Sequence, residues 1–406
     1  MTLPTNPAKI AVIGCGTAGP AAAILLRKQG HHVELFERAP ECRAVGAGFL
    51  LQPSGMAVLR ELGILDAVLA RAAKVKRLNV VHPDGRSLLD LHYGEIHPDL
   101  FGAGLHRPVL LEQLIAAMRS TGVQIHWGME ITDARRTHGK WEILTPNGTA
   151  ASGFDLLIIA DGARSKLRDL ASTNSINRGY PWGAHWFIGR NDGAFPEDEL
   201  YQIVRGTRKL SGFLATGLGH ENGDRLVSLF WSVRIADDQA WRQKPLDSWK
   251  QEILNLCPKA KGLLDQIHSW DQVLLARYGD VRMRRWHGDD IVVLGDAAHA
   301  MSPQLGQGVN LALADASCLA RCLSEQPIPR ALKLYQRRRR LNLWYYQLST
   351  RWLTPWFQSD HEWLTPFRSI FFTITRHLPP ARRFMTKTMA GLVFSKTPLP
   401  TKNGAG

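Results

Sequence analysis

The first 37 residues carry the pattern that most restricts the fold of this chain. An apolar strand is expected at residues 9–13, and Gly14, Gly16 and Gly19 follow it at once in a GxGxxG spacing. A helix and a second strand come next, closed by Glu37, whose carboxylate can accept hydrogen bonds from a ribose. In such a unit the first glycine allows a tight turn, the second lets the backbone approach a pyrophosphate, and the third brings the helix close to the strand. The pattern therefore predicts a parallel βαβ unit that binds a dinucleotide.

Residues 291–315 hold a second glycine-rich turn between a strand and a helix. A short apolar run ends at Gly295 and Asp296, and Pro303 and a Gly-Gln-Gly sequence at 306–308 follow. The apolar spacing after this loop predicts a helix whose N-terminus faces it. Backbone N–H groups and the positive end of the helix dipole can then stabilise an anionic or electron-rich ligand.

A third block begins with the continuous apolar run at residues 154–160, which predicts a strand buried on both faces. Asp161 and Gly162 follow it directly. Open α/β sheets bind ligands at the carboxyl ends of their strands. We therefore expect Asp161 at a ligand site.

Antiparallel signals separate these blocks. Two strands are expected at residues 76–81 and 87–91 around a Pro-Asp-Gly turn, and strands rich in aromatic and β-branched residues are expected between residues 184 and 278. We predict a mixed α/β fold in three parts. A Rossmann-like domain with a parallel sheet takes residues 1–70, 100–175 and 280–335, an antiparallel β-sheet substrate domain takes 71–99 and 176–279, and a basic, aromatic-rich helical segment takes 336–406.

Length and composition exclude several classes of protein. The chain of 406 residues is long enough for more than one core. Its five cysteines form no CxxC pair and no zinc-like cluster with histidine, so we expect reduced thiols and no metal. The first residues lack the apolar core of a signal peptide, and no run of about 18 apolar residues suits a membrane-spanning helix. These observations predict a cytoplasmic protein.

The net charge of +14 is concentrated near the C-terminus. From residue 333 onward there are thirteen Lys and Arg residues and two acidic ones, and residues 337–340 are four consecutive arginines. One interpretation is a helical cap on the dinucleotide domain with its arginines in solvent. The other is an amphipathic segment whose aromatic and basic residues contact the inner face of an anionic membrane. No recognised fold supports a nucleic-acid partner.

Together the three blocks resemble the class A flavin-dependent aromatic monooxygenases, which share the para-hydroxybenzoate hydroxylase fold. The blocks are GCGTAG with Glu37, DGARSKLR at 161–168 and LGDAAHAMSPQLGQGVN at 294–310, and Arg107 before a helix is a further family feature. The resemblance covers roughly residues 8–335 and implies FAD as cofactor, NADH or NADPH as a transient co-substrate, and O2. The absence of a second GxGxxG agrees with it, because the family also lacks one.

The resemblance also implies which residues hold FAD. The glycines of the first block would cradle the pyrophosphate, Glu37 would hold the adenosine ribose, and the helix after the third block would point at the flavin ring. His299 is interpreted as support for that loop. The predicted cofactor-binding residues are Gly14, Gly16, Thr17, Ala18, Gly19, Glu37, Arg38, Arg43, Arg107, Asp161, Asp296, Pro303, Gly306, Gln307, Gly308, Val309 and Asn310.

The implied reaction is hydroxylation or epoxidation of an aromatic or other electron-rich, lipophilic small molecule through a flavin C4a-hydroperoxide. In such chemistry the protein supplies orientation and a dry pocket, so no catalytic side chain is predicted. Each candidate for the pocket lining also suits a place in the core. These candidates, on strands of the second domain, are His185, Trp186, Phe213, Phe230 and Trp231.

Three other functions stay open from the sequence. A flavin-dependent halogenase would carry a WxWxIP segment, and the strand at 230–234 reads FWSVR instead. A flavin oxidoreductase of prenyl lipids would reduce its substrate without oxygen transfer. A non-catalytic flavin-binding protein would bind the cofactor but show no NAD(P)H oxidation stimulated by an aromatic substrate.

Overall fold

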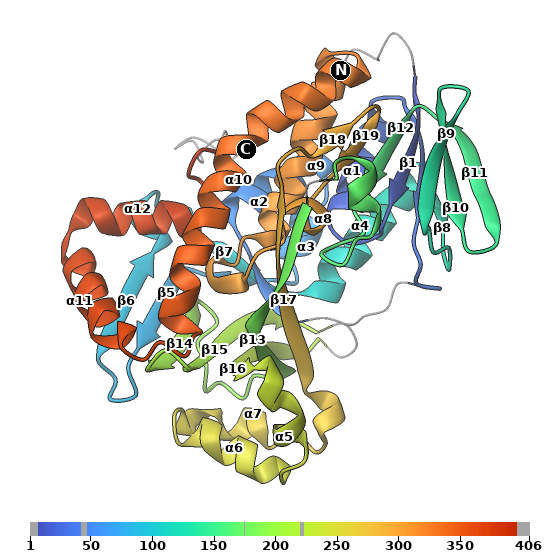
Figure 1. The fold of residues 1–406 in the computed structure, drawn as a ribbon. Coiled ribbons are helices and arrows are strands. Elements are labelled where there is room, and N and C mark those ends of the chain that lie inside the picture. Colours follow the sequence, from blue (N-terminus) through green and yellow to red (C-terminus); the bar gives the residue numbers. More distant parts are fainter. Residues whose placement is uncertain (1–6, 42–46, 174, 220–222, 396–406) are drawn as a thin grey trace.

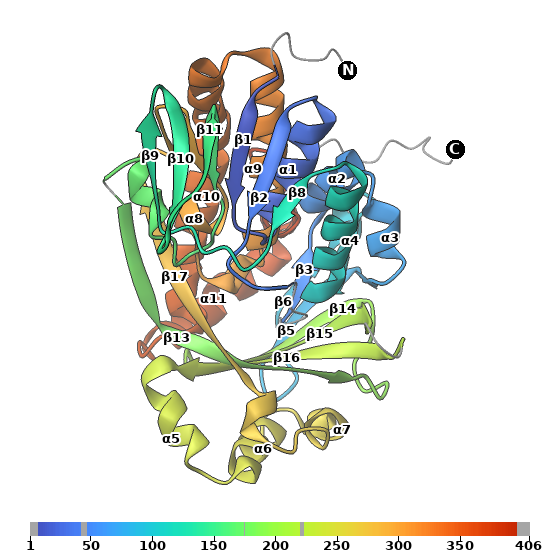
Figure 2. The same cartoon turned by 90° about the vertical axis from the view of Figure 1, so that its right-hand side faces the viewer.

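The structure, a computed structural model, describes residues 7–41, 47–173, 175–219 and 223–395 (Figure 1). Their strands form a six-stranded sheet, a seven-stranded sheet and two three-stranded sheets. Figures 1 and 2 show the six-stranded sheet in the upper part of the molecule and the seven-stranded sheet below it. The long helix α10 (Ile328–Phe357) runs from the first sheet toward the second.

The six-stranded sheet contains the segments that were predicted to be parallel. Its order is β18-β19-β12-β1-β2-β8, and all neighbours run parallel except β18 and β19. Its central strands are buried on both faces, as expected for a parallel sheet that is covered on both sides. The strands are β1 (Lys9–Ile13), β2 (His32–Phe36), β8 (Gln124–His126), β12 (Leu156–Ile159), β18 (His287–Gly288) and β19 (Ile291–Val293).

A small antiparallel sheet interrupts this parallel order. It consists of β9 (Asp133–Thr137), β10 (Lys140–Thr145) and β11 (Gly148–Phe154). The sequence did not predict strand β11. The strand predicted at 154–160 is therefore shorter and begins at Leu156, because Phe154 ends β11 and pairs with Trp141.

The seven-stranded sheet joins strands from distant parts of the chain. Its order is β17-β13-β16-β15-β14-β5-β6, so the predicted hairpin β5–β6 extends the sheet built by later strands. Helices α5 (Asp238–Arg242), α6 (Leu246–Leu254) and α7 (Lys261–Leu264) cover one face (Figure 2). The strands are β5 (Arg77–Val81), β6 (Ser87–His92), β13 (Ser175–Arg190), β14 (Glu199–Arg205), β15 (Lys209–Leu218), β16 (Arg225–Arg234) and β17 (Leu274–Met283). The domain boundaries stay a prediction.

The second three-stranded sheet packs against the other face of this large sheet. Its strands are β3 (Gly48–Leu51), β4 (Ala73–Val75) and β7 (Gly102–His106). Contact is close at Gly104, where a Cβ atom would lie 1.9 Å from the Ala215 carbonyl oxygen, so only glycine fits. The helices beside this sheet are α2 (Pro53–Leu62), α3 (Leu65–Leu69) and α4 (Arg107–Ser120).

The C-terminal segment is helical, as predicted. Its first helix, α10, begins before residue 336, extends to Phe357 and includes Pro355. Helices α11 (Leu364–His377) and α12 (Pro379–Met389) follow and pack beside β6 (Figure 1). None of the helices in the described ranges combines the length and hydropathy needed to cross a bilayer.

A buried ionic cluster joins the loop after β19 to the long C-terminal helix. The carboxylate of Asp315, on α9 (Gly308–Glu325), accepts hydrogen bonds from the Gly295 N–H at 3.0 Å and from Arg339 Nε at 2.7 Å, and it lies 2.5 Å from His299 Nε2. Arg339 also donates to Asn342 Oδ1 at 2.8 Å. Burial tends to raise the pKa of Asp315, but His299 and Arg339 outweigh burial and lower that pKa to about 2.

Replacing one residue of this cluster should show how much its ion pairs contribute to the stability of the fold. We expect Arg339→Ala to lower the free energy of unfolding by about 3–5 kcal/mol, because it leaves Asp315 without its cationic partner. Arg340→Ala, one residue along and exposed, is the matched control and should change stability by no more than about 0.5 kcal/mol. Thermal unfolding of both variants, saturated with FAD, measures the difference. Equal midpoints for the two variants would contradict the stabilising role of the cluster.

Candidate functional site

The carboxyl ends of four neighbouring strands meet at one edge of the six-stranded sheet. Because β19, β12, β1 and β2 are adjacent and parallel, Asp296, Asp161, Gly14 and Glu37 follow their ends at that edge. Gly14 and Asp161 touch, since a Cβ atom on Gly14 would lie 2.8 Å from the Asp161 Cα. Three sequence blocks far apart in the chain thus come together, as expected for a ligand site in an open α/β sheet.

The three glycines of the first block have the geometry of a dinucleotide cradle. Gly14 has φ +104, and a Cβ there would lie 2.5 Å from the Ala160 carbonyl oxygen. A Cβ on Gly19 would lie 2.0 Å from the Gly14 carbonyl oxygen, so α1 (Ala18–Lys28) packs directly on the turn. Gly16 faces open space, where a pyrophosphate could approach the bare backbone. Thr17 and Ala18 begin α1 at this turn.

Glu37 lies beside this cradle in an orientation that suits a ribose. One of its carboxylate oxygens accepts a hydrogen bond from the Cys15 N–H at 2.6 Å, and the other accepts from the Ala39 N–H at 2.9 Å. These bonds hold the carboxylate at the turn, and its remaining lone pairs can accept from a ribose diol.

Asp161 presents a buried carboxylate oxygen toward the same edge. Its Oδ1 is buried and has no well-formed hydrogen bond among the described residues, although the Ser165 side chain interacts with this carboxyl, and burial raises its pKa. Arg168 holds the loop that follows, because its guanidinium donates to the Ser165 carbonyl at 3.1 Å and to the Ala163 carbonyl at 2.5 Å. A buried acceptor without a well-formed hydrogen bond, on a braced loop, fits a ligand hydroxyl.

The third block places a helix N-terminus beside an exposed carboxylate. Gly295 has φ +58 and leads into the short helix α8 (Asp296–His299). Gly306, with φ +60, ends a turn that begins at Pro303 and leads to α9. A Cβ atom on Gly308 would lie 3.7 Å from Asp296 Oδ1, so Asp296 faces the first residue of α9. The arrangement can hold polar and anionic parts of one ligand along the loop.

Two predicted cofactor residues of this block have structural bonds instead. Asn310 Oδ1 accepts from the Gln52 N–H at 2.8 Å, and its amide group donates to the Leu50 carbonyl. Gln307 is buried and donates to the Met389 carbonyl at 2.7 Å. Both side chains tie the loop to other elements, so we expect any contact of these residues with a cofactor to come from their backbone. Val309 is half-buried on the first turn of α9.

The structure gives little information about the three arginines that were predicted to bind the cofactor. Arg38 and Arg107 are exposed, Arg38 just after Glu37 and Arg107 at the start of α4. Arg43 lies outside the residues that the structure describes.

The five predicted pocket residues lie on opposite faces of the seven-stranded sheet. His185, Phe213 and Trp231 belong to the face covered by α5–α7. His185 lies 2.8 Å from Asp238 Oδ1 and packs against Trp249, while Phe213 and Trp231 are members of the same buried cluster. The structure therefore does not place these three on the face that carries Trp186 and Phe230, and we leave them out of the proposed substrate site.

Trp186 and Phe230 lie on the opposite, inner face. Their rings are in register on β13 and β16 and 5.7 Å apart. Tyr278 on β17 interacts with Trp186, and the Tyr278 hydroxyl and the Trp186 Nε1 atom have no well-formed hydrogen bond within the described ranges. Tyr278 cannot be recognised from the sequence alone, because the sheet face it occupies depends on the pairing of β17 with β13.

Gln358, at the end of α10, connects this inner face to the glycine-rich loop. Its amide donates to the Gly183 carbonyl at 3.0 Å and to Ser232 Oγ at 3.2 Å, and its carbonyl accepts from Gln304 at 2.6 Å. Ser232 is two residues from Phe230 and shares its face. The loop after β19 therefore borders the wall that carries Trp186 and Phe230.

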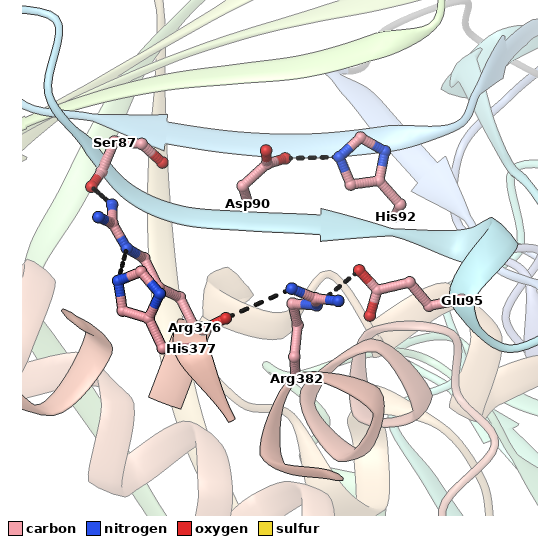
Figure 3. Close-up of a pocket in the computed structure, with 7 residues that line it drawn as sticks. All are labelled: Ser87, Asp90, His92, Glu95, Arg376, His377 and Arg382. Atoms are coloured by element: carbon pink, nitrogen blue, oxygen red, sulfur yellow. Dashed lines mark hydrogen bonds and ion pairs between the residues drawn. The ribbon is translucent and has the colours of Figure 1, made fainter. Parts of the chain in front are cut away.

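A separate cavity of about 440 Å³ lies between β6 and the last two helices (Figure 3). Its charged side chains are engaged with one another or with the backbone, including Arg382 with Glu95 at 2.7 Å and Arg376 with the Ser87 carbonyl at 2.6 Å. None of the predicted cofactor or pocket residues lines it. It is therefore not the dinucleotide site.

Comparisons with known proteins agree with the geometry. A family model described as an FAD binding domain matches residues 7–345. The chain is 30% identical to 3-amino-4-hydroxybenzoate 2-monooxygenase of Streptomyces cremeus, over 82% of this chain and 86% of the relative. It is 31% identical to a Rhodococcus erythropolis protein named for 2-heptyl-3-hydroxy-4(1H)-quinolone synthesis, over 77% and 79% of the two chains. Its fold is similar to that of Klebsiella pneumoniae HpxO complexed with FAD and uric acid, with a TM-score of 0.80, 20% identity and coverage of 95% and 97%.

Substitutions at Gly16 and Gly19 should separate a loss of FAD binding from a loss of folding, because the two glycines have different surroundings. Gly16→Val places a side chain in open space, so we expect a folded protein that loses bound FAD. Gly19→Ala places a Cβ 2.0 Å from a carbonyl oxygen and should destabilise the fold itself. Flavin absorbance per protein and circular dichroism measure the two effects. A folded Gly16→Val variant with full flavin content would show that this turn is not the cradle.

Proposed function

Because the chain belongs to the family of FAD-dependent aromatic monooxygenases, we propose that it hydroxylates a neutral, lipophilic aromatic substrate bound against the inner face of the seven-stranded sheet. The protein is an FAD-dependent monooxygenase, and the substrate and the residues that bind it are the proposal. The overall reaction consumes one NAD(P)H, one O2 and one proton, and releases NAD(P)+, water and the hydroxylated product.

A neutral substrate is proposed because the sheet face around Trp186 and Phe230, here called the substrate wall, is uncharged. The positions directly opposite Trp186 and Phe230, and those two residues along the same strands, hold no Asp, Glu, Lys or Arg, whereas Arg190 and Arg234 lie at the ends of this face. A carboxylate on such a wall would be buried without a cationic partner, which is costly. An apolar ring carrying a hydroxyl, amino or carbonyl group suits it better. The uncharged positions are Ala184, Trp186, Ile188, Leu210, Gly212, Leu214, Ser228, Phe230, Ser232, Leu274 and Ala276.

Two polar atoms on this wall can orient such a ring. Burial raises the pKa of the Tyr278 hydroxyl, so the hydroxyl stays protonated and can donate a hydrogen bond to a substrate oxygen. The Trp186 Nε1 atom is a second buried donor, and it interacts with the Tyr278 oxygen and so helps to orient this hydroxyl. These donors would fix which ring carbon faces the cofactor, and the apolar wall would exclude water.

The residues gathered at the edge of the six-stranded sheet would hold FAD. We propose the glycine turn for the pyrophosphate, Glu37 for the adenosine ribose, and Asp161 and Asp296 for the ribityl and pyrophosphate side. When bound, FAD supplies the transfer of one oxygen atom from O2 with electrons from NAD(P)H. The N-terminus of α9, next to Asp296, would stabilise negative charge on the reduced ring.

A lipophilic substrate also concentrates in lipid. We therefore propose that the enzyme works at a membrane surface, which it reaches through its C-terminal segment. The relative named for a heptyl-quinolone supports a substrate of this kind.

A substrate panel tests the proposed function. NADH and NADPH oxidation by the purified yellow protein should be stimulated by neutral hydroxylated or aminated aromatics more than by their carboxylated analogues, with oxygen incorporated into the product. Oxygen uptake and mass spectrometry of the products are the measurements. Preferential stimulation by the carboxylated analogues would contradict the neutral wall.

A pair of tyrosine variants tests which face binds the substrate. Tyr278→Phe removes the proposed donor, and we expect kcat/KM to fall about five-fold, since a net hydrogen bond contributes about 1 kcal/mol. Tyr201→Phe makes the same change on the opposite face, beside Phe213, and should leave kcat/KM within about two-fold. A larger effect from Tyr201→Phe than from Tyr278→Phe would place the substrate elsewhere.

A further inference from the structure

We propose that the exposed faces of α10 and α11 form a docking surface for a bilayer of anionic phospholipids, on which the protein lies without crossing it. In the described part of the chain, the exposed large hydrophobic side chains other than Ile176 and Leu274 all lie on the three C-terminal helices, at Trp363 and Leu378 on either side of α11, or at Phe394. Most of this surface lies beyond residue 345, where the match to the family model ends. A contiguous apolar patch of this extent marks an interaction site.

Helix α10 contributes one amphipathic stripe. Leu341, Trp344, Leu348 and Trp352 recur at helical spacing and are all exposed, with Trp344 58% accessible. Toward the N-terminus the same face continues with the exposed Arg337. The opposite face of α10 is buried and includes Arg339 of the ionic cluster. Because that face is fixed in the core, the helix cannot rotate to bury the exposed apolar stripe.

Helix α11 contributes a second stripe that meets the first. Its exposed residues recur every three or four positions, and Trp363, the residue before the helix, is 65% accessible. The two stripes join where Trp352 contacts Phe371 with their ring centroids 5.3 Å apart. The exposed large side chains of this stripe are Trp363, Phe367, Ile370, Phe371, Ile374 and Leu378.

The positive charges of these helices indicate that the partner of this surface is anionic. Helices α10, α11 and α12 contain no acidic residue and twelve Lys and Arg residues. Four of the arginines form ion pairs with other parts of the protein and two bind backbone carbonyls. The other six are exposed and have no ion pair within the described residues. They are Arg330, Lys333, Arg337, Arg340, Arg383 and Lys387.

An anionic lipid surface fits this surface better than a second copy of the chain. In a symmetric contact the same helices would face each other, bringing basic residues together with no acidic residue on these helices to compensate. Tryptophan and phenylalanine beside lysine and arginine suit the headgroup boundary, where aromatic rings insert and cations meet lipid phosphates.

The position of the surface relates it to the proposed substrate wall. Trp356 contacts both Trp352 and Phe371, with ring centroids 4.8 Å and 5.6 Å away. Trp356 and Phe230 pack against the same apolar cluster, which also contains residues of β5 and β6. A lipophilic substrate dissolved in the bilayer would thus meet the protein close to its binding wall. This last step rests on the proposed function, whereas the docking surface itself does not.

Flotation of the purified holoenzyme with lipid vesicles tests the proposal. The protein should float with vesicles of phosphatidylcholine and phosphatidylglycerol at low salt, and much less with phosphatidylcholine alone. Salt should weaken the binding as it screens the charges. The Arg337→Gln, Arg340→Gln double variant should bind about five-fold more weakly for each arginine removed. The Trp344→Gln, Trp363→Gln double variant should also lose binding, because both indoles are exposed.

Matched variants on other faces serve as controls. Ile176→Gln removes an exposed hydrophobic side chain from β13, and Arg119→Gln removes an exposed arginine from α4, and both should bind vesicles as the unaltered protein does. All variants should keep their flavin and their activity on a water-soluble substrate, which separates this test from the test of the proposed function.

Three results would overturn the proposal. One is failure of the unaltered holoenzyme to float with anionic vesicles at low salt. Another is equal binding by the double variants and the unaltered protein. The third is a dimer by light scattering that the Trp344→Gln, Trp363→Gln variant converts to a monomer without any vesicle binding, which would assign the surface to a second copy.

Discussion

The buried carboxylate of Asp315 is the constraint on which much of this structure depends. A charge with no exposure to solvent persists only if its partners are close and well oriented. The backbone of Gly295, the ring of His299 and the guanidinium of Arg339 meet that need from three different elements. The shape of the loop after β19 and the docking of α10 are therefore coupled, because neither can change without leaving a buried charge unpaired.

The C-terminal helices also hold the glycine-rich loop that is proposed to bind the cofactor. The loop that follows Gly295 bonds to them repeatedly, through Gln307 to Met389, through Ser302 to Thr354 and through Gln304 to Gln358. Gln358 then continues to Ser232 on the large sheet. One chain of hydrogen bonds thus runs from the glycine-rich loop to the proposed substrate wall. The C-terminal helices therefore help to fix the position of the glycine-rich loop relative to the large sheet.

Sequence patterns predicted most elements that are defined by neighbouring residues. The hairpin β5–β6 followed from a Pro-Asp-Gly turn between two strands, and the tight turn after β1 followed from the GxGxxG spacing, whose Gly14 has φ +104. The edge strand β11 was missed because its glycines, alanines and serine resemble a loop. The pocket residues show a different limit. Alternation along a strand says that Phe230 and Trp231 point to opposite sides, but it does not say which side α5–α7 will cover.

The sequence by itself determined the dinucleotide cradle, the order of the three ligand-binding blocks and the membership of the flavin monooxygenase family. These properties depend on backbone angles and close approaches within short stretches, such as the open space at Gly16 and the tight packing at Gly19. Only the tertiary structure decided that Tyr278 lies beside Trp186 and that Asp315 pairs with Arg339. It also decided that Gln358 connects the glycine-rich loop to the proposed substrate wall. The physical reason is that each of these contacts joins segments distant in the chain, whose relative placement is set by strand pairing and helix packing over the whole molecule.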